Sequence, residues 1–128
     1  MMEKRNRILV VDDELDLLHL MKRILEGAGY EVITAERGTD CLLLVQREQP
    51  DLILLDVRLP DMDGYQILER LKSDQTTHHI PVVMLTSLNQ GPDFQKALEK
   101  GVDWYITKPF EPEHILKRVN NLLRESGK

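Results

Sequence analysis

The sequence predicts an α/β protein built on a doubly wound, five-stranded parallel sheet with five helices that cover its two faces. Three observations predict this fold class. Short apolar runs with strand character alternate five times with longer segments of helical period. The runs expected inside the sheet are continuously apolar, as strands covered on both faces should be. The chain of 128 residues also has the length of one ordinary domain.

The five predicted strands are residues 8–11, 31–35, 52–55, 81–85 and 104–107. Each is a short apolar run, and a segment of helical period follows each one.

The first predicted helix ends at Gly27 or Gly29, where a left-handed cap costs little. One stripe of this helix is apolar and should face the sheet: Leu17, Leu18, Met21, Ile24 and Leu25. The second helix is predicted to open near Thr39 as its N-cap and to turn Leu42 and Val45 inward. On the same helix, Cys41 is expected in the core and Leu43 at the surface.

The remaining three helices show the same apolar periodicity. The third is predicted to begin at Gly64, the fourth to end at Gly101 and the fifth to follow Pro112. The third is expected to bury Ile67, Leu68 and Leu71. The fourth contains Phe94, Ala97 and Leu98, and the fifth contains Ile115, Val119, Leu122 and Leu123.

The composition excludes several classes of protein. Apolar residues make up 41% and charged residues 30% of the chain, which is ordinary for a globular protein. The formal net charge of -5 disfavours direct binding to nucleic acid or to an anionic membrane. The single cysteine rules out an internal disulfide, and no apolar run reaches the roughly 18 residues of a membrane helix. We therefore expect a cytoplasmic protein.

Polar residues follow four of the five predicted strands. Asp12 and Asp13 come directly after the first, Asp56 after the third, Thr86 and Ser87 after the fourth, and Lys108 after the fifth. Because the carboxyl ends of parallel strands meet at one edge of a sheet, these side chains are expected to converge there.

Crowded carboxylates at such an edge need a compensating charge. A hard divalent cation with oxygen ligands would supply it, and Mg²⁺ is favoured where phosphate oxygens also bind. Lys108 can neutralise the remainder. An ionised carboxylate beside a metal can attack phosphorus and form an acyl phosphate, and Asp56 is the best candidate for this nucleophile. The cation, Lys108 and Thr86 would then stabilise the transferred phosphoryl oxygens.

With these residues in place, the chain resembles a response-regulator receiver domain of two-component signalling, of the kind found in chemotaxis regulators. The resemblance covers nearly the whole chain. It carries over Asp12 and Asp13 as the acidic pair, Asp56 as the phosphoacceptor, Thr86 as the strand-four hydroxyl, Lys108-Pro109 as the lysine-proline pair and Tyr105 as the aromatic switch residue. It also implies that the backbone carbonyl of Arg58 binds the metal beside Asp12, Asp13 and Asp56.

Further properties follow from the resemblance alone. It implies a flavodoxin-like strand order of 2-1-3-4-5 and a cis bond between Lys108 and Pro109. It implies a phosphoacceptor rather than a turnover enzyme, with a sensor histidine kinase or a histidine phosphotransfer protein as phosphodonor. Residues 1–128 are expected to form one receiver domain without an output domain in this chain. Arg58 and Leu88 are expected to flank the site and influence how water reaches it.

Several alternatives were weighed against this interpretation. Asp12 or Asp13 alone could cap the first helix, and the segment DMDG could belong to a turn or a calcium loop. A calcium loop would require an acidic first ligand and a final glutamate, but this chain has Leu59 and Arg70 at those positions. A magnesium-dependent phosphatase of the haloacid-dehalogenase type needs a general acid where Arg58 stands. A flavin carrier would need a phosphate-binding loop where this chain is acidic.

The only tryptophan suggests where a partner binds. Trp104 and Tyr105 begin the last predicted strand, and strand alternation places them on opposite faces. We expect Trp104 to be partly exposed and to form, with Tyr105 and the neighbouring fourth and fifth helices, an output surface. The alternative is that Trp104 only packs over the fifth helix.

Overall fold

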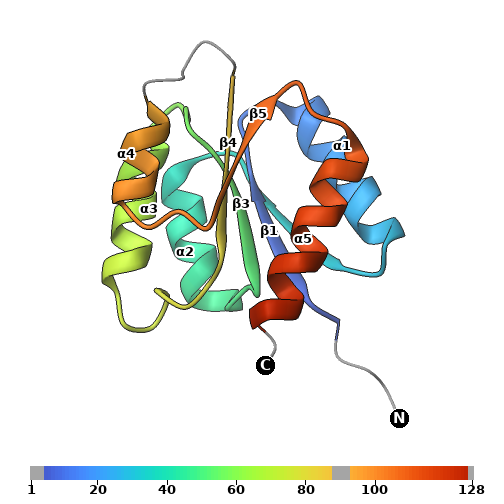
Figure 1. Cartoon of the computed structure of the whole chain (residues 1–128), viewed down its shortest axis with the longest axis horizontal. Helices are drawn as coiled ribbons and strands as arrows, with labels where there is room; N and C mark the ends of the chain where they lie inside the picture. The colour runs from blue at the N-terminus through green and yellow to red at the C-terminus, as the bar shows by residue number, and fades with distance from the viewer. Residues whose placement is uncertain (1–4, 88–92, 127–128) are drawn as a thin grey trace.

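The structure, a computed structural model, describes residues 5–87 and 93–126 (Figure 1). The strands are β1 (Arg7–Val11), β2 (Glu31–Ala35), β3 (Leu52–Asp56), β4 (Val82–Ser87) and β5 (Trp104–Lys108). The helices are α1 (Leu15–Gly27), α2 (Gly38–Glu48), α3 (Gly64–Ser73), α4 (Asp93–Glu99) and α5 (Pro112–Ser126).

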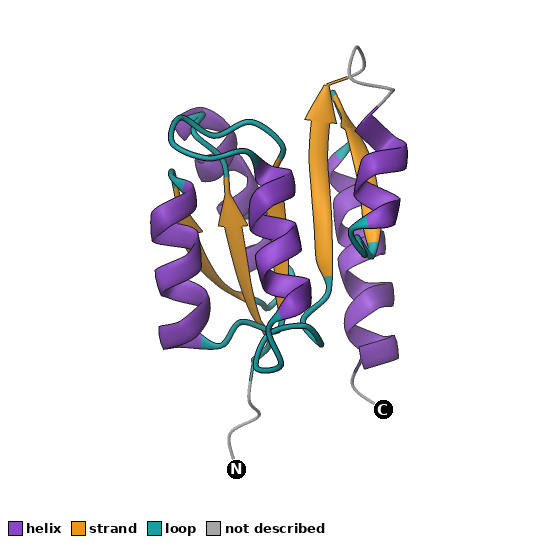
Figure 2. Cartoon of the chain, turned by 90° about the vertical axis from the view of Figure 1, so that its left-hand side faces the viewer, coloured by secondary structure: helices purple, strands orange, loops and turns teal. Residues whose placement is uncertain are grey.

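The five strands form one parallel sheet in the order β2-β1-β3-β4-β5. The strands run side by side in one direction with helices on both sides of them (Figure 2). Every residue of β3 is buried, whereas the edge strands β2 and β5 contain exposed positions. The predicted fold class and the strand order implied by the resemblance are both confirmed.

Two apolar cores lie on the two faces of the sheet, because side chains alternate along each strand. Leu9, Ile53 and Met84 point toward α2, α3 and α4 in one core. Ile8, Leu54 and Val83 point toward α1 and α5 in the other. In Figure 1, α2, α3 and α4 accordingly lie on one side of the strands and α1 and α5 on the other. The sheet is thus fixed from both faces, and its carboxyl edge is free to present polar groups.

The predicted strand ends were too short at the carboxyl edge. β3 continues to Asp56 and β5 to Lys108, and β4 runs over residues 82–87 instead of 81–85. The prediction stopped at the last apolar residue, but the pairing continues into the polar ones: Asp56 pairs with Leu85, and Ser87 with Lys108. Asp56, Thr86 and Lys108 therefore stand on the strands themselves rather than on loops.

Two predicted helix ends agree with the structure: α1 ends at Gly27 and α3 begins at Gly64. α4 ends at Glu99, two residues before the predicted Gly101, although Gly101 does have a left-handed φ of 89°. Thr39 is not an N-cap: α2 begins at Gly38, and its N-cap residue is Arg37. The first amides of α2 bind Asp61, which lies far away in the sequence, so no local signal marked the start.

Side-chain burial follows the predicted stripes where it is described. Cys41 is buried, and Leu43 is 58% exposed, both as expected. On α4, Ala97 is fully buried, whereas the neighbouring Leu98 is 49% exposed. The side chain of Phe94 lies outside the described residues. Within the described ranges, no helix is long and apolar enough to cross a membrane.

Candidate functional site

The predicted site residues meet at the carboxyl edge of the sheet. Asp12 directly follows β1, Asp56 is the last residue of β3 and Lys108 is the last residue of β5. Lys108 Nζ lies 2.9 Å from Asp12 Oδ2 and 3.3 Å from Asp56 Oδ1. Residues separated by up to 96 positions in the chain therefore share one polar cluster.

Three carboxylates at this edge of the sheet can act together as metal ligands. Asp12, Asp13 and Asp56 each offer an oxygen, and these oxygens all lie within 4.8 Å of one another. Asp12 and Asp56 are buried while Asp13 is exposed, so the group opens to solvent on one side. Oxygen donors with an open side fit Mg²⁺, which keeps water or phosphate oxygens among its ligands. The three carboxylates expected from the sequence are thus brought together.

The electrostatics of Asp56 reflect its burial. Its pKa is raised to about 6, first by desolvation and next by the charge of Asp12, and Lys108 offsets part of this rise. Removing a carboxylate from water disfavours its ionised form. A divalent cation bound to the same oxygens would act in the opposite direction. Asp56 is therefore a carboxylate whose ionisation depends on its cationic neighbours.

Lys108 contacts a third acid that the sequence analysis did not single out. Besides Asp12 and Asp56, its ammonium lies 3.5 Å from Glu14 Oε1. Burial alone would lower the pKa of Lys108, but the hydrogen bond to Asp12 and the charges of Asp56 and Asp12 outweigh it, and the pKa is raised. Lys108 consequently stays charged at the centre of the cluster. Glu14 follows Asp13 directly, so the run of acids was its only sequence signal.

Asp12 and Asp13 do not cap α1. The N-cap residue is Glu14, whose side chain makes no capping hydrogen bond. Asp12 Oδ1 accepts the N–H of Glu14, which precedes the helix, at 3.0 Å. The helix-cap alternative for this acidic pair is therefore wrong.

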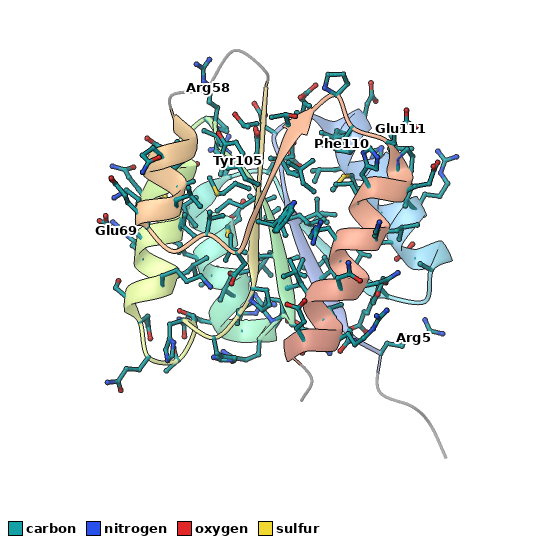
Figure 3. All side chains as sticks on the ribbon, viewed as in Figure 1. Arg5, Arg58, Glu69, Tyr105, Phe110 and Glu111 are labelled. Atoms are coloured by element: carbon teal, nitrogen blue, oxygen red, sulfur yellow. The ribbon has the colours of Figure 1, made fainter. Side chains whose placement is uncertain are left out.

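Thr86 and the aromatic residues lie on β4 and β5. Thr86 is buried near the end of β4. Tyr105 packs against the core of α2, α3 and α4, and its hydroxyl lies 3.4 Å from the hydroxyl of Tyr65 (Figure 3). Trp104 points to the other face, is 44% exposed and lies under the guanidinium of Arg118 from α5. The predicted exposure of Trp104 is confirmed, and its contact with the fifth helix is real as well.

The loop after Asp56 carries Arg58 at the same edge of the molecule, near the upper end in Figure 3. Arg58 pairs with Asp63 as an isolated antiparallel bridge. Asp63 Oδ1 accepts the N–H of Tyr65 and caps α3, and Asp61 binds two amides of α2. The side chains of both acids in DMDG thus accept hydrogen bonds from backbone amides, which argues against the calcium-loop alternative. Leu88, the other predicted flanking residue, lies outside the described residues.

The peptide bond between Lys108 and Pro109 is cis, as the resemblance implied.

Comparisons with known proteins agree on one family. The sequence model of the family described as "Response regulator receiver domain" matches residues 8–120. The chain is 43% identical over 122 residues to the "DNA-binding dual master transcriptional regulator RpaA" of Synechocystis, covering 95% of this chain and 51% of that protein.

Solved structures give the same result. The crystal structure of the "response regulator receiver domain protein (CheY-like)" from Methanospirillum hungatei is 33% identical, with a TM-score of 0.91 over 97% of this chain and 98% of that one. The chemotaxis response regulator CheY4 of Vibrio cholerae is 29% identical, with a TM-score of 0.87 over 93% and 99% of the two chains. This chain spans about half the length of the curated relatives that it matches first.

Proposed function

The chain belongs to the receiver domains of two-component response regulators, and on that premise we propose that Asp56 is the residue that accepts the phosphoryl group. The family match gives no support to the haloacid-dehalogenase alternative. One observation carries the proposal. Asp56 is a buried carboxylate at the tip of a central strand, with an ammonium 3.3 Å away on one side and two further carboxylates near it.

The phosphodonor is a sensor histidine kinase or a histidine phosphotransfer protein. In the transfer, a carboxylate oxygen of Asp56 attacks phosphorus, the bond from phosphorus to the histidine nitrogen breaks, and the electron pair stays with the imidazole. The side chain of Asp56 becomes an acyl phosphate. The domain assists this step and its reversal by water, but it is a phosphoacceptor rather than a turnover enzyme.

The proposed cofactor is Mg²⁺. Its protein ligands would be Asp12, Asp13 and Asp56 together with the backbone carbonyl of Arg58. When bound, the cation would neutralise the carboxylates and share the charge of the phosphoryl oxygens. The three carboxylate oxygens, all within 4.8 Å of one another, support this assignment.

Lys108 and Thr86 are proposed to stabilise the phosphoryl group. The ammonium of Lys108 already lies between Asp12 and Asp56, so it can turn to new oxygens with little movement. Thr86 is buried on the neighbouring strand β4, whose Leu85 pairs with Asp56. A hydroxyl drawn toward the phosphoryl group would vacate space into which Tyr105 can rotate.

The output surface is proposed to comprise α4, β5 and α5, with Trp104 at its centre. Trp104 is a large aromatic side chain that remains 44% exposed. Exposed aromatic residues are frequent anchors of protein interfaces. We further propose that residues 1–128 act as one receiver domain in the cytoplasm, without direct contact to nucleic acid or membrane.

The test is phosphorylation by a small-molecule donor. The full chain is incubated with acetyl phosphate and Mg²⁺ and analysed by intact-mass spectrometry. One phosphoryl adduct is expected, absent in Asp56→Asn and absent with excess chelator. An adduct that persists in Asp56→Asn would overturn the assignment of the phosphoacceptor.

A further inference from the structure

The loop that follows Asp56 is closed at its base. Gly64 donates its N–H to the carbonyl of Val57 at 2.7 Å, and Arg58 pairs with Asp63. A Cβ on Gly64 would lie 2.5 Å from the backbone oxygen of Asp56, so only glycine permits this close approach. The base of the loop is therefore held directly against the strand that carries Asp56.

The tip of the same loop is anchored to α2 by Asp61. Its Oδ1 accepts the N–H of Gly38 at 2.7 Å, and its Oδ2 accepts the N–H of Thr39 at 3.0 Å. The side chain of Arg37, the N-cap residue of α2, makes no capping hydrogen bond. Backbone hydrogen bonds, that from Gly38 above all, lower the pKa of Asp61, which therefore stays ionised at neutral pH. One carboxylate thus joins the loop to two amides that lie 23 and 22 residues earlier in the chain.

Apolar side chains also pack closely against the start of α2. A Cβ on Gly38 would lie 2.8 Å from Sδ of Met62 and 2.8 Å from Cδ1 of Ile67. The side chain of Met62, from the loop, thus packs directly on the first residue of α2. Farther along, α2 is fixed in the core by the fully buried Cys41 and Val45. The helix is therefore a rigid support for the loop tip.

We propose that Asp61 is a positioning residue for the divalent cation, because by fixing the loop tip to α2 it limits the directions in which the Arg58 carbonyl can point. This inference rests on the proposed function, in which that carbonyl is a metal ligand. Mg²⁺ demands near-ideal octahedral geometry, so a carbonyl ligand without a fixed orientation weakens Mg²⁺ binding. Groups that orient metal ligands from outside the first coordination sphere commonly affect affinity strongly.

The competing explanation is that Asp61 only stabilises the start of α2. A helix cap of that kind would change the free energy of unfolding and leave the Mg²⁺ affinity of the folded protein unchanged. A positioning residue changes the affinity itself. The two explanations therefore differ in a measurable quantity.

The experiment compares Asp61→Ala, Asp61→Asn and a matched control, Asp74→Ala, in the full chain. Asp74 also accepts two hydrogen bonds, from the N–H and the hydroxyl of Thr76 at 2.8 and 2.7 Å, but it lies at the other end of α3. The Mg²⁺ dissociation constant is measured by isothermal titration calorimetry at a temperature where circular dichroism shows every variant to be folded. Hydrogen exchange of the Gly38 and Thr39 amides reports the anchor directly.

Asp61→Ala is expected to raise the dissociation constant roughly tenfold, the low end of the usual effect of losing an orienting partner. Asp61→Asn keeps one acceptor oxygen and should lie closer to the wild type, while Asp74→Ala should match the wild type. The inference is overturned if Asp61→Ala binds Mg²⁺ as tightly as the wild type. It is also overturned if Asp61→Asn and Asp61→Ala lose the same affinity, because the lost charge alone would then explain the effect. If the wild type itself binds no Mg²⁺, the proposed function fails and this inference falls with it.

Discussion

The guanidinium of Arg118 lies over the indole of Trp104, with Cζ 3.5 Å from the ring centroid. This contact joins β5 to α5 within the proposed output surface. A cation over an aromatic face contributes about 0.5–1 kcal/mol at an exposed site, so the pair is held only lightly. Small movements of β5 or α5 should therefore change the surroundings of the indole.

The first prediction uses this indole as a probe of the switch. Beryllofluoride with Mg²⁺, which mimics a phosphoryl group on aspartate, is expected to change Trp104 fluorescence because rotation of the adjacent Tyr105 shifts β5. The change should be absent in Asp56→Asn and Lys108→Ala. An unchanged spectrum at saturating beryllofluoride, with binding confirmed independently, would mean that the signal leaves Asp56 by another surface.

The second prediction concerns the stability of Asp56→Asn. The pKa of Asp56 in the folded protein, about 6, lies above its ordinary value of 3.8, so the metal-free folded state holds this proton more tightly than the unfolded state. The associated stability is present below pH 4 and is lost as pH rises through about 6. At pH 7 without Mg²⁺, the ionised Asp56 therefore destabilises the fold.

Asparagine removes this charge, so Asp56→Asn should be more stable than the wild type by about 1–2 kcal/mol at pH 7 with chelator. Urea unfolding at pH 7 and pH 4 measures the difference. The advantage should shrink at pH 4, where the wild-type carboxyl is protonated. Equal stability at pH 7 would contradict the burial argument.

The third prediction concerns Lys108→Ala. Asp12 is fully buried and Asp56 nearly so, and without the ammonium both lose their nearest cation. Breaking a buried ion pair by removing one partner is costly, and we expect a loss of about 2–4 kcal/mol at neutral pH without Mg²⁺. Adding Mg²⁺ should recover part of this loss, since it supplies a replacement charge. Urea unfolding with and without Mg²⁺ tests this, and a loss that Mg²⁺ leaves untouched would argue against the metal site.

The fourth prediction separates metal binding from folding. Asp13 is exposed, so Asp13→Ala should leave the stability within about 0.5 kcal/mol of the wild type, as is usual for surface substitutions. Its Mg²⁺ affinity should fall, because one of the three carboxylate ligands is gone. Asp16→Ala, a nearby exposed acid in the first turn of α1, is the matched control. If both variants bind Mg²⁺ equally well, the metal role of Asp13 is wrong.

Much of this protein was predictable from the sequence because the relevant signals are local. Apolar runs and helical periodicity reveal strands and helices wherever burial imposes a period of two or of 3.6 residues. The topology rule for parallel sheets then places Asp12, Asp56 and Lys108 at one edge before any coordinate is known. The convergence of these three residues was predicted for this reason and is confirmed.

The features that the sequence did not reveal depend on contacts between distant segments. Asp61 accepts a hydrogen bond from the first amide of α2, and Glu14 is the third carboxylate near Lys108. The guanidinium of Arg118 lies over the ring of Trp104. None of these pairings leaves a periodic or compositional trace, because each depends on how a loop closes or how a helix packs over the sheet. The sequence by itself determined which elements form and which edge carries the chemistry. Only the tertiary structure decided which side chains contact each other. Hydrogen bonds and ion pairs depend on atomic positions to within about an ångström, and local sequence patterns do not encode such positions.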